Sequence, residues 1–378
     1  MKGNTQLRQE SIKRVLFEIR QCGPISKREL QAITGFSWGN ISSITTLLMN
    51  EKYIVASGKQ ETSIGRKPEE FDINTRDHYI IGIDFNSEGV LAVVCDLRGR
   101  VVSKQHTFFA EKSKDFVLRD FFSLIEKILF KNKDKNISHI ALAMQGEVDV
   151  ENGISVKISD IEEWVNIPIC EWLQNRFGIK TVMLHDPDCL LYTEKYFGVL
   201  NGKEINNAVL LRIDHGVGMA CMLGGKMYMG NRGRTCEIGM TAVPTENGWS
   251  LFKNIVKEKT IEKRYGELTG LSMNCSAIAD VAHKGKKEAK KVFADIGNAL
   301  GFALNNAVSF FNPDALILYG DFTKYSELFL GEAKNILKNF LPDEAPEILL
   351  SNLDDTAAAV GAALFAADHV IEELDLTS

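Results

Sequence analysis

The same order of strands and helices occurs twice in the chain, and this repetition limits the possible fold more than any other feature. Between residues 79 and 196, three apolar runs joined by tight turns are followed by alternating helical and strand patterns. A second copy starts at Asn207 with a hairpin and continues to His369. Because 378 residues are too many for one ordinary core, the repetition predicts two α/β lobes with a cleft between them.

A glycine-rich segment, residues 212–239, begins the second copy. Glycine at this density indicates turns, or a close approach of the backbone to a ligand. The runs Ala208–Ile213 and Val217–Leu223 predict a β-hairpin around Asp214-His215-Gly216. Its tip could bind an anion or could be a tight turn with no ligand, and the residues leave both alternatives open. Glu237, a single charge between apolar neighbours, favours a ligand site at the far end of the segment.

Three helical patterns precede the first lobe. Residues Gln6–Gln21 carry an apolar stripe with helical spacing. A capping box that begins at Ser26 predicts a short helix over Lys27–Thr34, and a glycine ends it. Ser37 then caps a third helix that continues to about Asn50. A short helix, a glycine-containing turn and a longer helix are typical of a helix-turn-helix.

The exposed face of the third helix is the candidate DNA-binding surface, because small polar side chains there can reach base edges and phosphates. Two further runs, Tyr53–Ser57 and Glu69–Ile73, predict a two-stranded wing with basic residues at or near its tip. The candidate DNA-binding residues are Ser37, Trp38, Asn40, Ser42, Ser43, Arg66 and Lys67, with Thr45 expected on the same face. A three-helix packing module that binds no nucleic acid is the alternative.

Charge supports a polyanion partner for this module. Residues 1–76 contain twelve Lys and Arg against eight Asp and Glu, so they are net positive, whereas the whole chain has a net charge of −6. No apolar run approaches the ~18 residues of a membrane span, and residues 1–14 lack the apolar stretch of a secretory signal. The seven cysteines are scattered without a Cys-x-x-Cys pair. We therefore expect a reduced, cytoplasmic protein with no membrane partner.

Six segments carry a family pattern: TGFSWGNISSITTLLMNEKYIV and SIGRKPEEFDIN at the N-terminal end, then LHDPDCLLYTEKYFG, HGVGMACMLGGKMYMGNRGRTCEIGM, NPDALILYG and TAAAVGAALF. Together they resemble the ROK family (repressors, open reading frames and sugar kinases) in its repressor arrangement. The resemblance implies a winged helix-turn-helix over residues 1–76 and a two-lobed, actin-like (ribonuclease-H-like) body of the sugar-kinase type. It implies a first lobe at 77–200, a second lobe with a dimerisation surface at 201–354, and a helix at about 355–378 that packs back near the first lobe.

The phosphate-binding turn departs from the family pattern. A ROK kinase holds ATP phosphates with an Asp-x-Gly-Gly-Thr turn, but this chain reads Asp84-Phe85-Asn86-Ser87-Glu88. We expect Glu88 to lie near the phosphates and to oppose their charge. The later double glycine is also altered, to Tyr319-Gly320-Asp321. We therefore expect no ATP cofactor and no kinase activity, with no catalytic residue beyond Asp186 in a vestigial base position.

The resemblance also implies which residues contact a sugar. Asp186 would accept a hydrogen bond from a sugar hydroxyl, although a role as a helix cap is the alternative. Glu237 retains a sugar-contact position, within a family Gly-Glu-Ile-Gly-His motif that here reads Cys236-Glu237-Ile238-Gly239-Met240. The other implied ligand-binding residues are His185, Gly146, Glu147 and Asp160. For Trp164, packing in the core and stacking on a ligand are equally open.

A structural zinc ion is not expected, because Met240 replaces a zinc-binding histidine and the cysteine-rich loop of the family is missing. The combined prediction is a homodimeric or tetrameric repressor whose affinity for a double-stranded operator responds to a sugar or sugar derivative. One alternative is an ATP-dependent sugar kinase that retains a DNA-binding module. The other is a repressor whose body responds to a protein partner instead of a small molecule.

Overall fold

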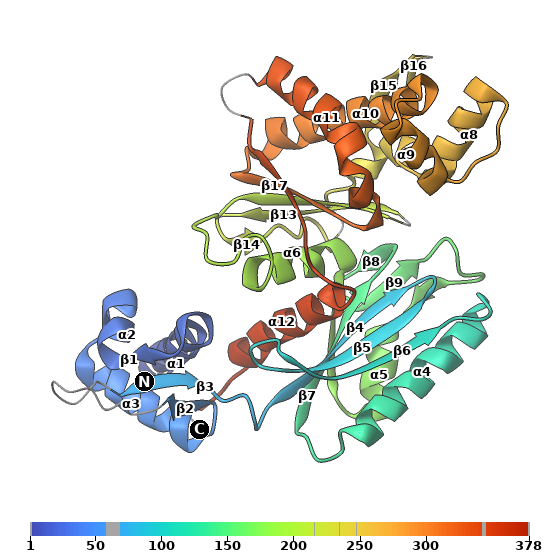
Figure 1. The fold of residues 1–378 in the computed structure, drawn as a ribbon. Helices are drawn as coiled ribbons and strands as arrows, with labels where there is room; N and C mark the ends of the chain where they lie inside the picture. Colours follow the sequence, from blue (N-terminus) through green and yellow to red (C-terminus); the bar gives the residue numbers. More distant parts are fainter. Residues whose placement is uncertain are drawn as a thin grey trace. The chain divides into compact units, whose positions relative to one another are not determined.

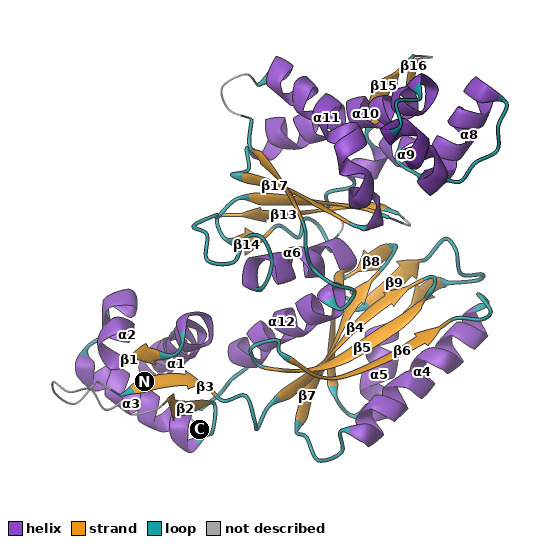
Figure 2. Cartoon of the chain, viewed as in Figure 1, coloured by secondary structure: helices purple, strands orange, loops and turns teal. Residues whose placement is uncertain are grey.

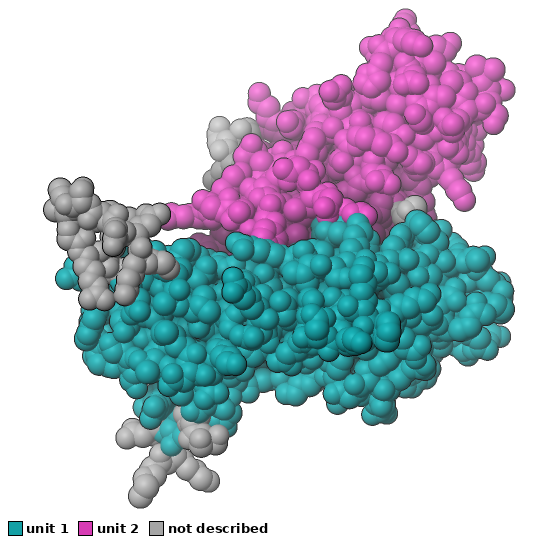
Figure 3. Space-filling model, turned by 60° about the horizontal axis from the view of Figure 1, so that its bottom comes forward, with its two compact units in different colours: residues 1–189, 356–378 teal, residues 190–355 magenta. Residues whose placement is uncertain are grey.

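The computed structural model describes residues 2–57, 69–214, 216–233, 235–246, 248–341 and 345–376. It divides the chain into two compact units, which Figure 3 colours separately. Unit 1 contains residues 1–189 and 356–378, and unit 2 contains residues 190–355. The division falls inside helix α6 (Asp186–Tyr196), earlier than the boundary after residue 200 that the sequence suggested.

The N-terminal module of unit 1 consists of three helices and a small antiparallel sheet (Figures 1 and 2). The helices are α1 (Lys2–Cys22), α2 (Lys27–Thr34) and α3 (Trp38–Asn50). The sheet has the order β1-β3-β2, with β1 (Ile25–Ser26), β3 (Glu70–Ile73) and β2 (Ile54–Ser57). The three helices and both wing strands were predicted. The two-residue strand β1 was not, because so short a strand has no readable period.

Side-chain hydrogen bonds explain where α2 and α3 begin. Ser26 Oγ accepts a hydrogen bond from the Glu29 amide at 3.3 Å, and the Glu29 carboxylate accepts one from the Ser26 amide at 2.8 Å. This reciprocal pair is the predicted capping box, and the Ser26 amide that donates to Glu29 lowers the pKa of the carboxyl. Gly35, in the left-handed region at φ 72°, ends α2. Ser37 Oγ then accepts from the Asn40 amide at 3.3 Å to start α3.

The remainder of unit 1 is built on a five-stranded sheet with the order β11-β7-β4-β5-β6. Strands β11 (Lys180–His185), β7 (Ile137–Met144) and β4 (Tyr79–Asn86) are parallel, and β5 (Gly89–Asp96) and β6 (Val101–Phe108) continue antiparallel. Helices α4 (Lys114–Lys131) and α5 (Ile169–Phe177) share a core with one face of this sheet. A small sheet, β10-β9-β8, was not predicted; its strands are β8 (Glu147–Asp149), β9 (Ile154–Lys157) and β10 (Val165–Ile167).

Helix α12 (Ala357–Glu372) packs on β4 and β7. Its alanine-rich sequence allows a close approach, because an alanine side chain adds little thickness between helix and sheet. A Cβ atom placed on Gly82 in β4 would lie 2.0 Å from the backbone oxygen of Ala359. Only glycine fits at this contact. Helix α12 therefore belongs to unit 1, where it covers β4 and β7 of the five-stranded sheet.

Unit 2 repeats this topology. Its sheet has the order β14-β13-β12-β17-β18, in which β12 (Ala208–Ile213), β17 (Ala315–Tyr319) and β18 (Glu347–Leu350) are parallel. Strands β13 (Val217–Leu223) and β14 (Lys226–Met227) continue it antiparallel. The helices are α7 (Phe252–Ile255), α8 (Glu258–Thr269), α9 (Cys275–His283), α10 (Lys287–Phe311) and α11 (Ser326–Phe340). The matching strand orders confirm the duplication read from the sequence.

The contact at Gly82 can be tested by adding one methyl group. We expect Gly82→Ala to lower the free energy of unfolding by about 1–3 kcal/mol, because β4 and α12 must separate to accommodate it. Gly39→Ala in α3 is the matched control, since a Cβ there meets nothing within 4 Å and alanine favours a helix. Urea unfolding measures both variants. Equal stability of Gly82→Ala and the parent protein would contradict the close packing.

Candidate DNA-binding face and ligand site

The exposed side of α3 carries the predicted DNA-binding residues that the structure describes. Ser37, Trp38 and Ser43 are exposed, whereas Asn40 and Ser42 are half-buried. Trp38 has 51% of its surface exposed, which is unusual for a large aromatic residue without a packing role. A capped helix with a polar, accessible first turn has the form that a recognition helix needs to enter a major groove.

Thr45 was expected on the exposed side, and this is wrong: its side chain is fully buried. Its hydroxyl donates to the Ile41 carbonyl at 2.9 Å, one turn earlier, so it satisfies its polar group inside the module. Arg66 and Lys67, placed at or near the tip of the wing, lie outside the described residues.

One buried arginine joins the helix-turn-helix module to the rest of unit 1. The side chain of Arg20, near the end of α1, is 1% exposed. Its Nε donates to the Leu97 carbonyl at 2.7 Å, directly after β5, and its Nη2 donates to the Leu364 carbonyl of α12 at 3.1 Å. Its Nη1 forms an ion pair with Asp368, also on α12. A single guanidinium therefore holds α1 against both the sheet and the C-terminal helix.

Arg98 makes the reciprocal connection from the sheet to the module. Its Nη2 donates to the Gly23 carbonyl at 2.9 Å and forms an ion pair with Asp72 of β3. Sequence reasoning missed both arginines, because an arginine in a helix or a turn gives no sign of partners that lie far away along the chain.

The predicted base position lies at the edge of the unit 1 sheet. Asp84 of β4 and Leu184 of β11 both pair with Ala143 of β7, so β4 and β11 end on either side of one strand. The two ends are therefore about 10 Å apart. Asp186 follows β11 directly, is 3% exposed, and has its Oδ1 3.4 Å from His185 Nε2.

Carboxylates gather at this edge. Burial, followed by the charges of Asp188, Asp186 and Asp84, raises the pKa of the Cys189 thiol. Helix α6 begins three residues earlier than expected, so Asp186 occupies its first turn. A carboxylate there stabilises the start of the helix, and this does not prevent it from accepting a hydrogen bond from a ligand. Such an edge offers acceptors to sugar hydroxyls and repels phosphate.

The other predicted ligand residues of unit 1 surround the small sheet. Gly146 has φ 89°, and a Cβ there would lie 2.2 Å from the Lys157 carbonyl of β9. Glu147 is exposed at the start of β8, a strand that contacts β11. Asp160 is exposed after β9. Gly146 and Glu147 therefore lie on elements that neighbour the strand ending at His185.

Trp164 belongs to the core, and the alternative of ligand stacking is wrong. Its side chain is 1% exposed, and its indole N–H donates to Ser155 Oγ at 2.8 Å. Its ring lies 5.2 Å from that of Phe85, inside the first-lobe core. The indole therefore has both its apolar surface and its polar group satisfied within the protein.

The turn after β4 is closed by its own surroundings. Asn86 Oδ1 accepts hydrogen bonds from the amides of Glu88 and Gly89 at 2.9 and 3.1 Å. Gln145 Oε1 accepts from the Ser87 amide at 2.7 Å. The Glu88 carboxylate forms an ion pair with Lys112 and is not directed only at a phosphate site, as we had expected. The obstacle to phosphate binding is instead that the backbone amides of the turn already have acceptors. A phosphate at this turn would have to displace these acceptors from the backbone amides.

The tip of the unit 2 hairpin is closed in a similar way. Asp214 Oδ1 accepts from the Gly216 amide at 3.3 Å, and Asp214 Oδ2 lies 2.7 Å from Arg212 Nε. The predicted hairpin is therefore present, and its tip carries a carboxylate. Of the two alternatives for this segment, the tight turn is favoured over the anion site. His215 at the tip is outside the described residues.

At the far end of the same segment, Glu237 is exposed and precedes a short 3₁₀ helix, Ile238–Met240. The chain then forms a hairpin, β15 (Ala242–Thr245) and β16 (Gly248–Leu251), at the position where the resemblance implied a zinc loop in the family pattern. Met240 is 52% exposed, and its thioether beside a hairpin without thiolates does not fit a tetrahedral zinc site. Among the described residues, no group of three or more His, Cys, Asp or Glu side chains could hold a metal ion.

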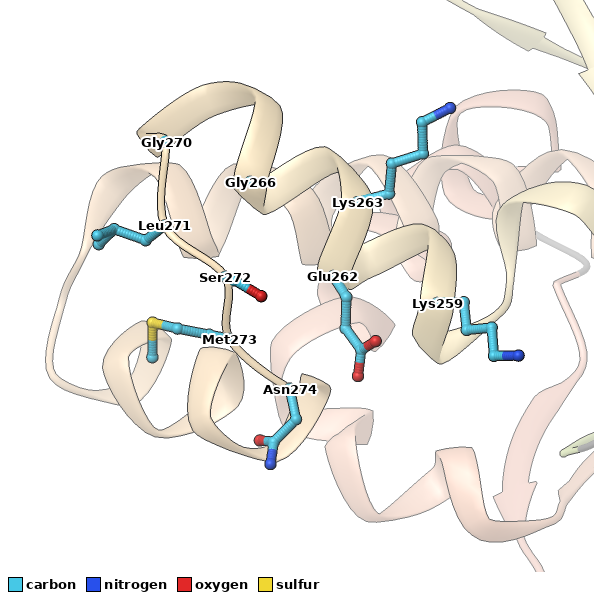
Figure 4. A pocket seen from close by; sticks show the side chains of 9 residues that line it. All are labelled: Lys259, Glu262, Lys263, Gly266, Gly270, Leu271, Ser272, Met273 and Asn274. Carbon is cyan, nitrogen blue, oxygen red and sulfur yellow. The ribbon is translucent and has the colours of Figure 1, made fainter.

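A surface hollow of about 650 Å³ opens in unit 2 between α8 and the segment before α9 (Figure 4). Its lining contains none of the predicted ligand residues. The Glu262 carboxylate in its wall accepts from the Cys275 amide at 3.0 Å, so it holds the start of α9. We therefore assign this hollow no part in the ligand site. None of the described helices has the length and apolar character that a membrane crossing requires.

Comparison with known proteins decides the family, because residues 80–369 match the ROK family model. The chain belongs to the ROK family. It is 23% identical over 373 residues to a xylose repressor of Bacillus spizizenii, covering 95% of each chain. It is also 23% identical over 334 residues to an N-acetylglucosamine repressor of Escherichia coli O6:H1, covering 82% of this chain and 80% of the relative.

Solved structures agree on the fold of this ROK protein. A ROK family transcriptional regulator, described as a homolog of the E. coli MLC protein, has a TM-score of 0.82 at 21% identity and covers 97% of this chain and 96% of its own. A ROK hexokinase from Thermus thermophilus has a TM-score of 0.67 at 20% identity and covers 78% and 99%. A ROK regulator and a ROK hexokinase therefore share the fold of the body, and the regulator matches almost the whole chain.

The role of Arg20 can be tested by measuring stability. We expect Arg20→Ala to lower the free energy of unfolding by about 3–5 kcal/mol, because Asp368 and two buried carbonyls lose their partner. Arg119→Ala on α4 is the control in the same unit; its side chain is 63% exposed, and its loss should change stability by no more than about 0.5 kcal/mol. Chemical denaturation monitored by circular dichroism compares the two. Similar small effects would show that Arg20 is not the connection described.

Proposed function

We propose that this ROK protein is a cytoplasmic, sugar-responsive transcriptional repressor. The observation that carries the proposal is the capped α2-turn-α3 unit with an exposed polar face, attached to a ROK body by the buried Arg20. The names of two relatives, a xylose repressor and an N-acetylglucosamine repressor, support it, because the alignments extend over most of both proteins.

For DNA binding, α3 enters a major groove and the wing contacts the backbone. In this proposal Asn40, Ser42 and Ser43 meet base edges, with Ser37 and Trp38 at the start of the helix. Arg66 and Lys67 provide charge for phosphate or the minor groove. We propose a homodimer, or a tetramer made of dimers, whose recognition helices meet half-sites one helical turn or a multiple of it apart.

For effector binding, we propose a sugar or sugar derivative held by hydrogen bonds to carboxylates. Asp186 accepts from a hydroxyl, Glu237 provides a second acceptor, and His185 donates or accepts beside Asp186. Gly146, Glu147 and Asp160 complete the proposed set. Neutral hydroxyls suit this set better than a phosphorylated sugar, because every acidic group in it would repel phosphate.

A path for the response follows from contacts within unit 1. Helix α12 packs on β4 and β7, and β7 pairs with β11, which leads to Asp186. The same helix provides the Leu364 carbonyl and Asp368 to Arg20 of α1. A shift of the sheet edge around a bound sugar would therefore move the surface on which the helix-turn-helix module is mounted.

We further propose that the chain does not transfer phosphoryl groups. The amides of Ser87, Glu88 and Gly89 already have acceptors in Gln145 and Asn86, so the turn has few donors to offer to ATP. The competing candidate is a sugar kinase, favoured by the retained Asp186 and by the body fold shared with a hexokinase.

DNA binding is tested with an operator selected from random duplexes and measured by fluorescence anisotropy. We expect Arg66→Ala to weaken binding to all sequences alike and to reduce the salt dependence by about one phosphate contact. Asn40→Ala should instead change the preferred base at one position, by about 1–3 kcal/mol. Lys127→Ala, an exposed lysine on α4, is the control and should bind like the parent. Parental behaviour of both test variants would show that the assigned face is wrong.

Effector binding is tested by thermal shift with D-xylose, N-acetylglucosamine, other hexoses and amino sugars, and their phosphates. A true effector at about 100 times its Kd should stabilise the protein by about 2.7 kcal/mol. Asp186→Asn should lose the shift, because an amide presents a donor where a carboxylate oxygen accepted. Asp134→Asn is the control and should retain the shift, because 72% of the Asp134 side-chain surface is exposed.

Two results would contradict parts of this assignment. If no sugar stabilises the protein while operator binding is intact, the effector is not a sugar, and the protein-partner alternative is favoured. If a coupled assay detects ATP-dependent phosphorylation of a sugar that disappears in Asp186→Ala, the protein is an enzyme and the proposed absence of phosphoryl transfer is wrong.

A further inference from the structure

The first turn of α3 exposes a large apolar side chain. Trp38 is the first residue of the helix, and 51% of its surface is exposed. Among the residues that the structure describes, none makes a hydrogen bond, a ring contact or an ion pair with its indole. Single exposed apolar residues are common on protein surfaces, so exposure alone indicates no partner. The position of Trp38 on the helix therefore has to decide what it meets.

Trp38 lies on the same side of α3 as the polar residues of the proposed DNA-binding face. Residues four positions apart are neighbours on a helix, so Trp38 lies beside Ser42, and Gly39 lies beside Ser43. The buried residues of the helix are Ile41, Ile44, Thr45 and Leu48. Trp38 and Gly39 therefore begin the two rows on which the proposed base contacts Ser42 and Ser43 lie one turn later.

Gly39 is a second observation about the same turn. Its backbone is helical, and a Cβ atom placed on it would meet nothing within 4 Å. Neither the conformation nor the packing of the described chain therefore requires glycine here, and alanine would favour the helix. The missing side chain instead lets another molecule come closer to the helix backbone. Gly39 is exposed, on the side from which DNA would approach.

The chemistry of the major groove limits what an indole can recognise there. The base edges present hydrogen-bond donors and acceptors, and the C5 methyl group of thymine is the apolar exception. An indole has one N–H donor and two apolar faces. Covering a thymine methyl removes apolar surface of both partners from water, whereas covering a polar edge removes hydrogen bonds to water. The ring of Trp38 therefore matches thymine better than the other three bases.

We propose that the first turn of α3 recognises a thymine in each operator half-site. The Trp38 ring covers the C5 methyl group, and Gly39 allows the helix backbone to come close to the same base pair. This inference rests on the proposed function, because it requires that α3 enters a major groove. It names the base, and the group on that base, that determine specificity at this position.

The methyl contact is tested with the operator selected from random duplexes. Each thymine of a half-site is replaced in turn by uracil, which lacks only the C5 methyl group, and the Kd is measured by fluorescence anisotropy. We expect one replacement to weaken binding of the parent protein about fourfold, the effect of burying one methyl group. Trp38→Ala should bind the thymine duplex more weakly than the parent and should not distinguish it from the uracil duplex.

Two further variants control this experiment. Trp38→Phe should retain the preference for thymine, because a phenyl ring can also cover the methyl group. Leu7→Ala removes another exposed apolar side chain of the same module, on α1, where 62% of the Leu7 surface is exposed. It should distinguish thymine from uracil as the parent does.

The close approach at Gly39 is tested by measuring stability and affinity together. Gly39→Ala should raise the urea midpoint of unfolding and yet weaken operator binding about tenfold or more, because the added methyl group lies between helix and DNA. Gly331→Ala in α11 is the matched control, since a Cβ atom there also meets nothing within 4 Å. It should raise the midpoint and bind the operator like the parent. Misfolding cannot explain a variant that is more stable and binds more weakly.

The outcomes separate this inference from the proposed function. If the parent binds its operator and no uracil replacement weakens binding, the thymine contact is wrong and the proposed function stands. A uracil effect that persists in Trp38→Ala would also overturn the inference, because another residue would then read the methyl group. Parental affinity of Gly39→Ala would overturn the close approach. If the parent selects no operator, the proposed function and this inference both fail.

Discussion

The attachment of the helix-turn-helix module to the rest of unit 1 centres on a buried guanidinium, which Arg98 supports from the side of the sheet. Removing a cation from water costs several kcal/mol unless its donors are satisfied, and Arg20 meets this condition with two backbone carbonyls and Asp368. These partners come from the end of β5 and from α12, so the helix-turn-helix module is part of the folded unit and not a tethered head. A repressor needs this property, because an effector can influence DNA binding only if the module is mechanically attached to the body that binds it.

The proposed division between sensing and catalysis has a simple chemical basis. A sugar hydroxyl needs acceptors, and the sheet edge around Asp186 retains carboxylates. A triphosphate needs donors, and the turn after β4 has committed its amides to Asn86 and Gln145. The hairpin tip at Asp214 follows the same rule, since its carboxylate takes the Gly216 amide. The same fold that supports phosphoryl transfer in a hexokinase can in this way retain a sugar site and lose the nucleotide site.

Features that depend on nearby residues were readable from the sequence. The capping box at Ser26 and Glu29 and the cap at Ser37 need only residues three positions apart, so their prediction was accurate. The duplicated order of strands was readable because apolar periodicity and turn residues are also local signals. The family resemblance, carried by motifs spread over nearly the whole chain, was confirmed by the match over residues 80–369. Thr45 marks the limit of local reading, because a small polar side chain at the edge of a helix face can satisfy itself and be buried.

Tertiary structure alone decided which distant groups meet. Nothing near Arg20 in the chain indicates that Leu364 and Asp368 are its partners. In the same way, nothing near Glu88 indicates its ion pair with Lys112. The core position of Trp164 belongs to the same class. The sequence by itself determined the family, the order of elements and the helix caps, because these follow from short-range backbone and side-chain preferences. Packing determined the connections, because a buried charge finds its partner only after the chain has folded.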